Sequence, residues 1–130
     1  MFSNIDLIEK ISQLAESEGR YEKEGYLFVL AALENTVSKL SVRRHLTGQE
    51  LSKGIAEYAV EQYGYLAKKI LNNWGIISTH DFGEIVYLMI EKKLMSKTEE
   101  DRIEDFNNVF DFSDEFSWDK IKPVYFPDRL

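Results

Sequence analysis

The clearest pattern of hydrophobic and polar positions lies between Leu71 and Leu94, where one helix is expected to end and another to begin. Trp74 is followed by Gly75, a residue that readily adopts the left-handed conformation found at helix C-termini. Ser78 or Thr79 can then cap the second helix. Apolar residues follow at every third or fourth position, as on one buried helix face. These residues are Phe82, Ile85, Val86, Met89, Ile90 and Leu94.

The preceding residues show three further helical patterns. A stripe of apolar residues, closed by Gly19, predicts a first helix over residues 4–17. The stripe consists of Ile5, Ile8, Ile11 and Ala15. The run from Tyr26 to Leu40 opens like a buried strand, but its leucine and alanine content favours a helix. Thr47 and Glu50 have the spacing of a capping box and start a third helix, and Gly64 either kinks that helix or separates it from the next one.

Residues 96–119 alternate carboxylates with the aromatic residues Phe106, Phe110, Phe112, Phe116 and Trp118. Thr98 could cap a short helix over residues 99–109, and residues 107–112 could equally form one small strand or hairpin. We expect an arm whose rings pack on the helical body. The alternatives are an exposed docking segment and an arm exchanged between subunits.

Together these patterns predict a mainly α protein, a single compact helical domain of about five helices over residues 1–119 that includes the acidic-aromatic arm 96–119. Two prolines predict an irregular tail over residues 120–130. A chain of 130 residues with 44% hydrophobic content can bury one core and is too short for two ordinary domains. The predicted core residues are Phe82, Ile85, Met89, Leu71, Trp74, Leu30, Leu33 and Ile55.

The net charge of −7 is concentrated in the arm, where nine acidic and two basic residues give −7, so that the rest of the chain is balanced. This distribution argues against a protein that wraps nucleic acid and against one that binds an anionic membrane, because both need a positive protein face. The absence of cysteine excludes disulfides, thiolate metal sites and cysteine nucleophiles. Without a signal-peptide pattern or an apolar run long enough to span a bilayer, the sequence predicts a soluble, cytoplasmic protein.

Four motifs in combination resemble a known protein family. They are RHLTGQEL at residues 44–51, YGYLAKKILNNWGI at 63–76, THDFGEIVYLMI at 79–90 and TEEDRIEDFNNVFDF at 98–112. The family is a set of small bacterial proteins described only as conserved hypothetical, and the resemblance covers residues 20–116. It implies no activity, ligand or catalytic residue, because none is assigned to the family. Such proteins usually carry alanine before the Tyr26 run, where this chain has Gly25.

One candidate metal site combines the two histidines. His80 and Glu84 lie four positions apart and would share a helix face, with Asp81 beside them. If His45 converged on them, these side chains could hold a metal ion. A histidine near a helix start is more often solvated or capping, so we expect no cofactor. A histidine next to a carboxylate could also serve a small enzyme, but no nucleophile motif supports one, and the sequence leans away from catalysis.

Residues 59–73 loosely resemble a helix-turn-helix, with Lys68 and Lys69 placed where such proteins contact DNA. Arg43 and Arg44 would supply further phosphate contacts. Every all-helical domain has junctions of this kind, however, and the acidity of the chain opposes a nucleic-acid partner.

The leading hypothesis is therefore an interaction or regulatory module that binds another macromolecule, more readily a protein than a nucleic acid. The basic run Arg43, Arg44 and His45 is the first candidate for its binding surface. The sequence leaves open whether the protein is a monomer or a homodimer.

Overall fold

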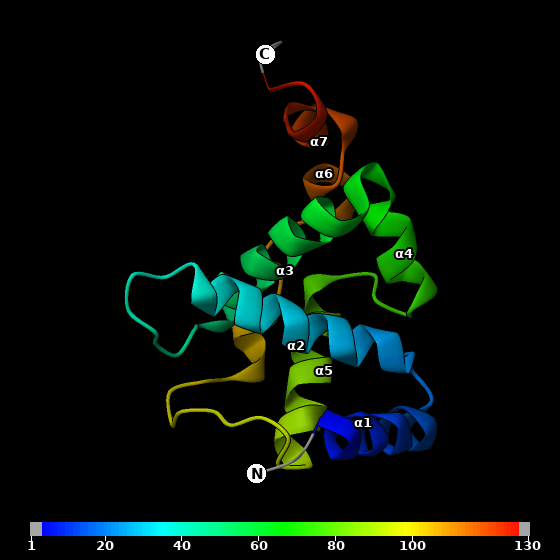
Figure 1. The fold of residues 1–130 in the computed structure, drawn as a ribbon, viewed down its shortest axis with the longest axis vertical. Helices are drawn as coiled ribbons and strands as arrows, with labels where there is room; N and C mark the ends of the chain where they lie inside the picture. Colours follow the sequence, from blue (N-terminus) through cyan, green and yellow to red (C-terminus); the bar gives the residue numbers. More distant parts are fainter. Residues whose placement is uncertain (1–3, 128–130) are drawn as a thin grey trace.

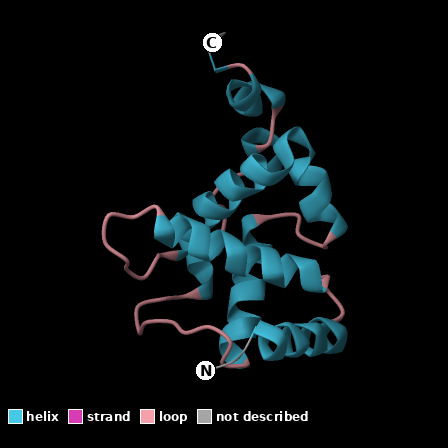
Figure 2. Cartoon of the chain, viewed as in Figure 1, coloured by secondary structure: helices cyan, strands magenta, loops and turns pink. Residues whose placement is uncertain are grey.

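The computed structural model describes residues 4–127, and in this part of the chain helices are joined by loops, with no strand (Figures 1 and 2). The predicted mainly α, single-domain fold is confirmed. The longer helices are α1 (Asn4–Glu18), α2 (Lys23–Ser38), α3 (Gly48–Tyr63) and α5 (Thr79–Glu91). The shorter ones are η1 (Gly64–Leu66), α4 (Ala67–Asn73), η2 (Ile103–Phe106), α6 (Phe112–Glu115) and α7 (Trp118–Tyr125). None of the helices in the described residues is long and apolar enough to cross a membrane.

Helix α2 occupies the centre of the fold and packs against α1, α3 and α5 (Figure 1). Helix α1 lies at one end of the molecule and α7 at the other. Of the predicted core residues, Ile55, Leu71, Phe82, Ile85 and Met89 are fully buried. The other three, Leu30, Leu33 and Trp74, are only partly buried and pack at the edge of the core.

The turn between α4 and α5 follows the predicted pattern. Gly75 has φ +90°, and its N–H donates to the Asn72 carbonyl at 3.0 Å. The Ile76 N–H donates to the Leu71 carbonyl at 3.0 Å, which completes a Schellman motif. A Cβ atom on Gly75 would lie 2.5 Å from the Arg20 carbonyl oxygen. Glycine is required here both by its dihedral angle and by the close passage of the segment between α1 and α2.

Helix α3 begins and ends at the residues that the sequence marks. The Thr47 hydroxyl accepts from the Glu50 N–H at 3.1 Å, and the Glu50 carboxylate accepts from the Thr47 N–H at 2.9 Å. This is the predicted capping box. Gly64 has φ +58° and opens the turn η1, so that it separates α3 from α4 rather than kinking one continuous helix.

The acidic-aromatic arm packs on its own domain. Phe106, Phe112 and Phe116 are buried and Phe110 is partly buried, as expected, whereas Trp118 is 50% exposed. Phe106 is the main anchor, because a Cβ atom added to Gly48 or to Gly83 would come within about 3 Å of it.

The local structure of the arm differs from the predictions. Neither the helix over residues 99–109 nor the strand near 107–112 forms; the described residues have only η2 and the short α6 there. Backbone groups turn instead toward side chains of α5, since the Thr79 hydroxyl donates to the Phe106 carbonyl at 2.6 Å and accepts from the Val109 N–H at 3.2 Å. These bonds replace the ladder that a strand would need.

Two further expectations are wrong for the described residues. Residues 120–125 of the expected irregular tail belong to helix α7, because Ile121 is 1% exposed and its burial holds this segment on the body despite Pro123. Residues 128–130 of that tail lie outside the described residues.

In α1, Ile5 and Ile8 are exposed, and Ile11 is buried together with Leu14. The buried stripe of α1 is therefore rotated from the predicted one.

Candidate functional site

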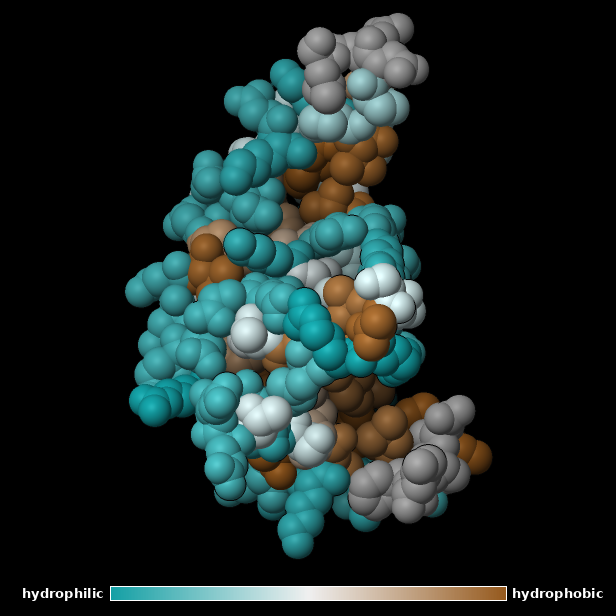
Figure 3. Space-filling model, turned by 90° about the vertical axis from the view of Figure 1, so that its left-hand side faces the viewer, coloured by the Kyte–Doolittle hydropathy of each residue, from teal (hydrophilic) through white to brown (hydrophobic). Residues whose placement is uncertain are grey.

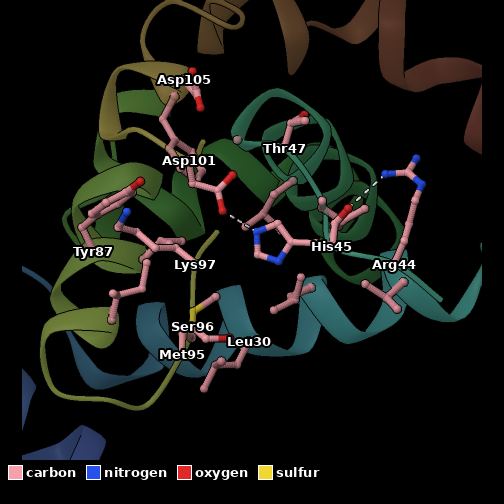
Figure 4. A pocket seen from close by; sticks show the side chains of 18 of the residues that line it. Leu30, Arg44, His45, Thr47, Tyr87, Met95, Ser96, Lys97, Asp101 and Asp105 are labelled. Carbon is pink, nitrogen blue, oxygen red and sulfur yellow. Dashed lines mark hydrogen bonds and ion pairs between the residues drawn. The ribbon is translucent and has the colours of Figure 1, made fainter. Parts of the chain in front are cut away.

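A cleft of about 530 Å³ opens between α2, the loop 39–47, the C-terminal end of α5 and residues 94–106 (Figure 4). Its floor is apolar and is formed by Leu30, Leu33 and Val37 of α2 together with Val86 and Ile90 of α5. This volume lies in the range of about 300–1,000 Å³ that is typical of small-molecule sites. We call this site the cleft.

The predicted basic run lies at the rim of the cleft, where Arg43, Arg44 and His45 all line it. Both arginines are held by carboxylates. Arg43 donates twice to Glu34, at 3.1 and 3.1 Å, and Arg44 donates twice to Glu50, at 3.0 and 2.7 Å. The Arg44 guanidinium, and next the Thr47 N–H, lower the pKa of Glu50 to about 2. The two arginines therefore fix the loop beside the cleft more than they offer free positive charge.

His45 meets a carboxylate at the mouth of the cleft. Its Nε2 atom lies 2.5 Å from Asp101 Oδ2, which also accepts from the Thr98 N–H at 2.8 Å (Figure 4). Partial burial acts to raise the pKa of Asp101, but the hydrogen bonds from Thr98 and His45 outweigh it and hold this pKa below its usual range. Asp101 is consequently an occupied acceptor.

Three hydrogen-bond donors that line the cleft, on Tyr87, Lys97 and Arg102, have no carboxylate partner in the described residues. The Tyr87 hydroxyl is buried and has no hydrogen-bond partner in the part of the chain that the structure describes. Burial, followed by the carboxylates of Asp101 and its neighbours, raises the pKa of Tyr87. The Lys97 ammonium donates to the Thr98 carbonyl at 3.3 Å, and neither Lys97 nor Arg102 forms an ion pair within residues 4–127.

A second surface lies near α7, at the opposite end of the molecule from α1. Its residues are large apolar side chains that are 45–62% exposed. They are Tyr65, Leu66, Trp118, Val124, Tyr125 and Phe126, and we call them the aromatic surface. On the face drawn in Figure 3, hydrophobic residues gather in patches at both ends of the molecule, and hydrophilic residues cover much of the rest.

The rings of the aromatic surface contact one another. Trp118 lies 5.8 Å from Tyr125, 6.4 Å from Tyr65 and 6.4 Å from Phe126, measured between ring centroids. The Tyr65 N–H donates to the Tyr125 hydroxyl at 3.2 Å, and a Cβ atom on Gly64 would overlap that hydroxyl. Helix α7 and turn η1 thus hold each other in one arrangement.

The predicted metal site does not form among the described residues, where no group of three or more histidine and carboxylate side chains is placed to hold an ion. His45 is bound to Asp101, whereas His80 contacts Glu84 Oε1 at 2.9 Å and the Asn107 side-chain oxygen at 2.8 Å. The hydrogen bond to Asn107, and then Glu84, raise the pKa of His80 against partial burial. Both ring nitrogens of His80 are therefore already engaged.

Asp81 and Glu84 have a structural part instead. Asp81 accepts from the Ile77 N–H at 2.8 Å, and the Tyr21 hydroxyl lies 2.6 Å from Asp81 and 2.9 Å from Glu84. Arg20 forms an ion pair with Glu84. Burial and the neighbouring Asp81 raise the pKa of Tyr21, so that it remains a donor. These contacts tie the segment between α1 and α2 to the start of α5.

The four cations of the helix-turn-helix hypothesis are not brought together. Arg43 and Arg44 line the cleft, while Lys68 and Lys69 belong to α4, which lies on the opposite side in Figure 1. Lys68 donates to the Ser113 hydroxyl at 3.0 Å. Helix α4 has only seven residues.

Comparison with known protein-family models, with curated proteins and with solved structures finds no match. The resemblance to a conserved hypothetical bacterial family therefore stays a prediction.

The sequence did not single out Tyr87, Lys97 or Arg102, which reach the cleft from α5 and from the arm. Tyr87 carried one available signal, because its hydroxyl interrupts an otherwise apolar stretch of α5.

Proposed function

We propose that the protein is an interaction module that binds a partner protein through the aromatic surface. The observation that supports this proposal is the gathering of six large apolar side chains, each 45–62% exposed, on η1 and around α7. Single exposed apolar residues are common on soluble proteins, but contiguous patches usually mark interaction sites. Tyrosine, tryptophan and phenylalanine are also the residues enriched in the energetic centres of protein interfaces.

The aromatic surface is already arranged for binding. Trp118, Tyr65 and Tyr125 contact each other, and the Tyr65 N–H bond to Tyr125 fixes η1 against α7. Tyrosine and tryptophan rings have few rotatable bonds, so that little conformational entropy is lost when a partner covers them. Because the surface is preformed, most of the free energy gained by burying the rings would contribute to the affinity for a partner.

The pairing of the α7 lysines favours a protein over a nucleic acid. Lys120 pairs with Asp114 and Glu115, at 3.3 Å each, and Lys122 pairs with Asp119 at 3.7 Å. A single-stranded nucleic acid could stack on exposed rings, but its phosphates need cations that the protein has not already neutralised. A protein segment makes no such demand.

Site-specific photo-cross-linking in cells tests the proposal. Benzoylphenylalanine would replace Tyr65 or Val124 within the aromatic surface, and Ile77, which is 68% exposed outside it, as the matched control. We expect adducts with a different protein from the first two positions and none from the third, and Trp118→Ser should abolish the Tyr65 adduct. Equal adducts from Ile77, or adducts only between two copies of the chain, would contradict the proposal.

A small enzyme is the second candidate, favoured by one observation. His45 Nε2 contacts Asp101 at the mouth of the cleft, an arrangement in which the carboxylate orients the imidazole and leaves Nδ1 as a base. Hydrolysis of p-nitrophenyl esters by the purified protein, lost in His45→Gln, would support this function. A rate equal to that of the variant would remove it.

A further inference from the structure

The cleft has a polar composition that is unequal between donors and acceptors. Each of the three carboxylates that line it has a partner within the protein: Asp101 Oδ2 is bound to His45 and to the Thr98 N–H, Asp105 Oδ2 accepts from the Arg102 N–H at 3.2 Å, and Glu34 is paired with Arg43. These contacts lie within the protein itself.

The donors facing the same space are less engaged. Lys97 uses one N–H on the Thr98 carbonyl, Arg102 has no ion pair and Tyr87 has no hydrogen-bond partner, all within the described residues. Figure 4 shows Tyr87 and Lys97 on the wall that also carries Asp101 and Asp105. The Tyr87 hydroxyl is closed off from solvent, so Lys97 and Arg102 are the donors that a ligand can reach.

The rest of the cleft is apolar. Leu30 and Leu33 on one side and Val86 and Ile90 on the other leave surface that gains when a nonpolar group displaces water. A ligand that matches both parts must combine an apolar body with oxygen acceptors at one end.

We propose that the cleft binds a small amphipathic acid, with its apolar body on the floor between α2 and α5 and its anionic oxygens on Lys97 and Arg102. The headgroup chemistry is that of a carboxylate, sulfonate or phosphate, each of which accepts charge-assisted hydrogen bonds from lysine and arginine. This site is separate from the aromatic surface, and it stands whether or not a partner protein docks there.

A matched pair of dyes tests the anion directly. N-phenyl-1-naphthylamine and 1-anilinonaphthalene-8-sulfonate share one apolar body, and only the second carries a sulfonate. Fluorescence titration should show the sulfonate dye binding about tenfold more tightly, a factor that corresponds to one or two charge-assisted hydrogen bonds. Equal affinities, or tighter binding of the neutral dye, would overturn the proposal.

Variants assign the effect to residues. Lys97→Gln and Arg102→Gln should each lower the affinity for the sulfonate dye about fivefold and change the affinity for the neutral dye by less than about twofold. Both side chains are exposed, so each substitution removes a positive charge without disturbing the core. Lys69→Gln, an exposed lysine on α4, is the matched control and should change neither affinity. If Lys69→Gln has the same effect as Lys97→Gln, the protein attracts anions by general charge and the site is not built.

A second pair of variants locates the dyes. Ser96 is exposed and lines the cleft, so Ser96→Trp should block both dyes without unfolding the protein. Trp118→Ser, on the aromatic surface, should not affect either dye. The reverse pattern would place the dyes on the aromatic surface and overturn the proposal.

Competition separates the sources of the headgroup. Decanoate and decyl phosphate should both displace the sulfonate dye. The one that displaces it at the lower concentration identifies the headgroup that the cleft prefers. Decylammonium has the same alkyl body and should displace it at least tenfold less well. Displacement by decylammonium as efficient as by decanoate would show that the cleft selects only for the apolar chain.

Discussion

The close contact between α2 and α3 at Gly54 allows a sharp test of how the body of the protein is packed. An alanine Cβ at position 54 would lie 2.2 Å from the Thr36 hydroxyl and 2.9 Å from its methyl group. The Thr36 hydroxyl is held, since it donates to the Ala32 carbonyl at 2.7 Å. The separation of these helices also sets the distance between Leu33 and Leu51 across the cleft. Gly54→Ala should therefore disturb both stability and the cleft.

The magnitude follows from opposing contributions. Replacing glycine by alanine inside a helix favours folding by about 0.5–1 kcal/mol. Overpacking a close interface costs about 1–3 kcal/mol, and turning the Thr36 hydroxyl away would lose a hydrogen bond worth about 1 kcal/mol. We expect a net destabilisation of about 1–3 kcal/mol, and each 1 kcal/mol lowers Tm by about 3–6 °C for a domain of this size.

A double-mutant cycle in urea, followed by circular dichroism, measures the coupling. Thr36→Ala removes the two nearest atoms and leaves the Cβ of residue 36 at 3.0 Å from the new methyl, so that most of the cost of Gly54→Ala should disappear in that background. The same loss of stability in both backgrounds would refute the explanation, because the cost would then not come from Thr36.

Three other predictions concern charge, the arm and nucleic acid. Because the folded-state pKa of Glu50 is lowered from 4.5 to about 2, its carboxylate stabilises the fold above pH 4.5, and this contribution disappears as pH falls toward 2. The stability gap between wild type and Glu50→Gln, about 1 kcal/mol at pH 7 after solvent screening, should accordingly close over that range in urea titrations. Phe112→Ala should cost about 3–5 kcal/mol, since its ring is buried 5.7 Å from that of Phe82; a loss below about 1 kcal/mol would show that the arm is not part of the core. The protein should pass through a DNA or RNA column at low ionic strength, and salt-dependent retention lost in Lys68→Ala/Lys69→Ala would revive the nucleic-acid hypothesis.

Local signals in the sequence predicted the helical body well. The capping box of Thr47 and Glu50 and the glycine after Trp74 act within one turn of backbone, so that neighbouring residues alone determine them. Helix α7 was missed because the burial of Ile121 against distant elements outweighs Pro123. Tertiary contacts of this kind leave no local pattern.

The residues of the candidate sites likewise divide into those that the sequence placed together and those that only the fold brings together. Arg43, Arg44 and His45 are adjacent in sequence, and the sequence placed them together on one surface. Tyr87 and Lys97 join them only because α5 and the arm fold back across the loop 39–47. The exposure of Trp118 was likewise beyond sequence reasoning, since its four companion rings in the arm are wholly or partly buried.

The central claim, that a partner protein covers the aromatic surface, is tested most directly by hydroxyl-radical footprinting of the chain in intact cells and after purification. Trp118 and Tyr65 are 50% and 62% exposed and should be oxidised readily in the purified protein. Inside cells we expect both rings to be protected several-fold, while Ile77 on the control surface is labelled equally in the two samples. Equal oxidation of Trp118 in cells and after purification would contradict the claim.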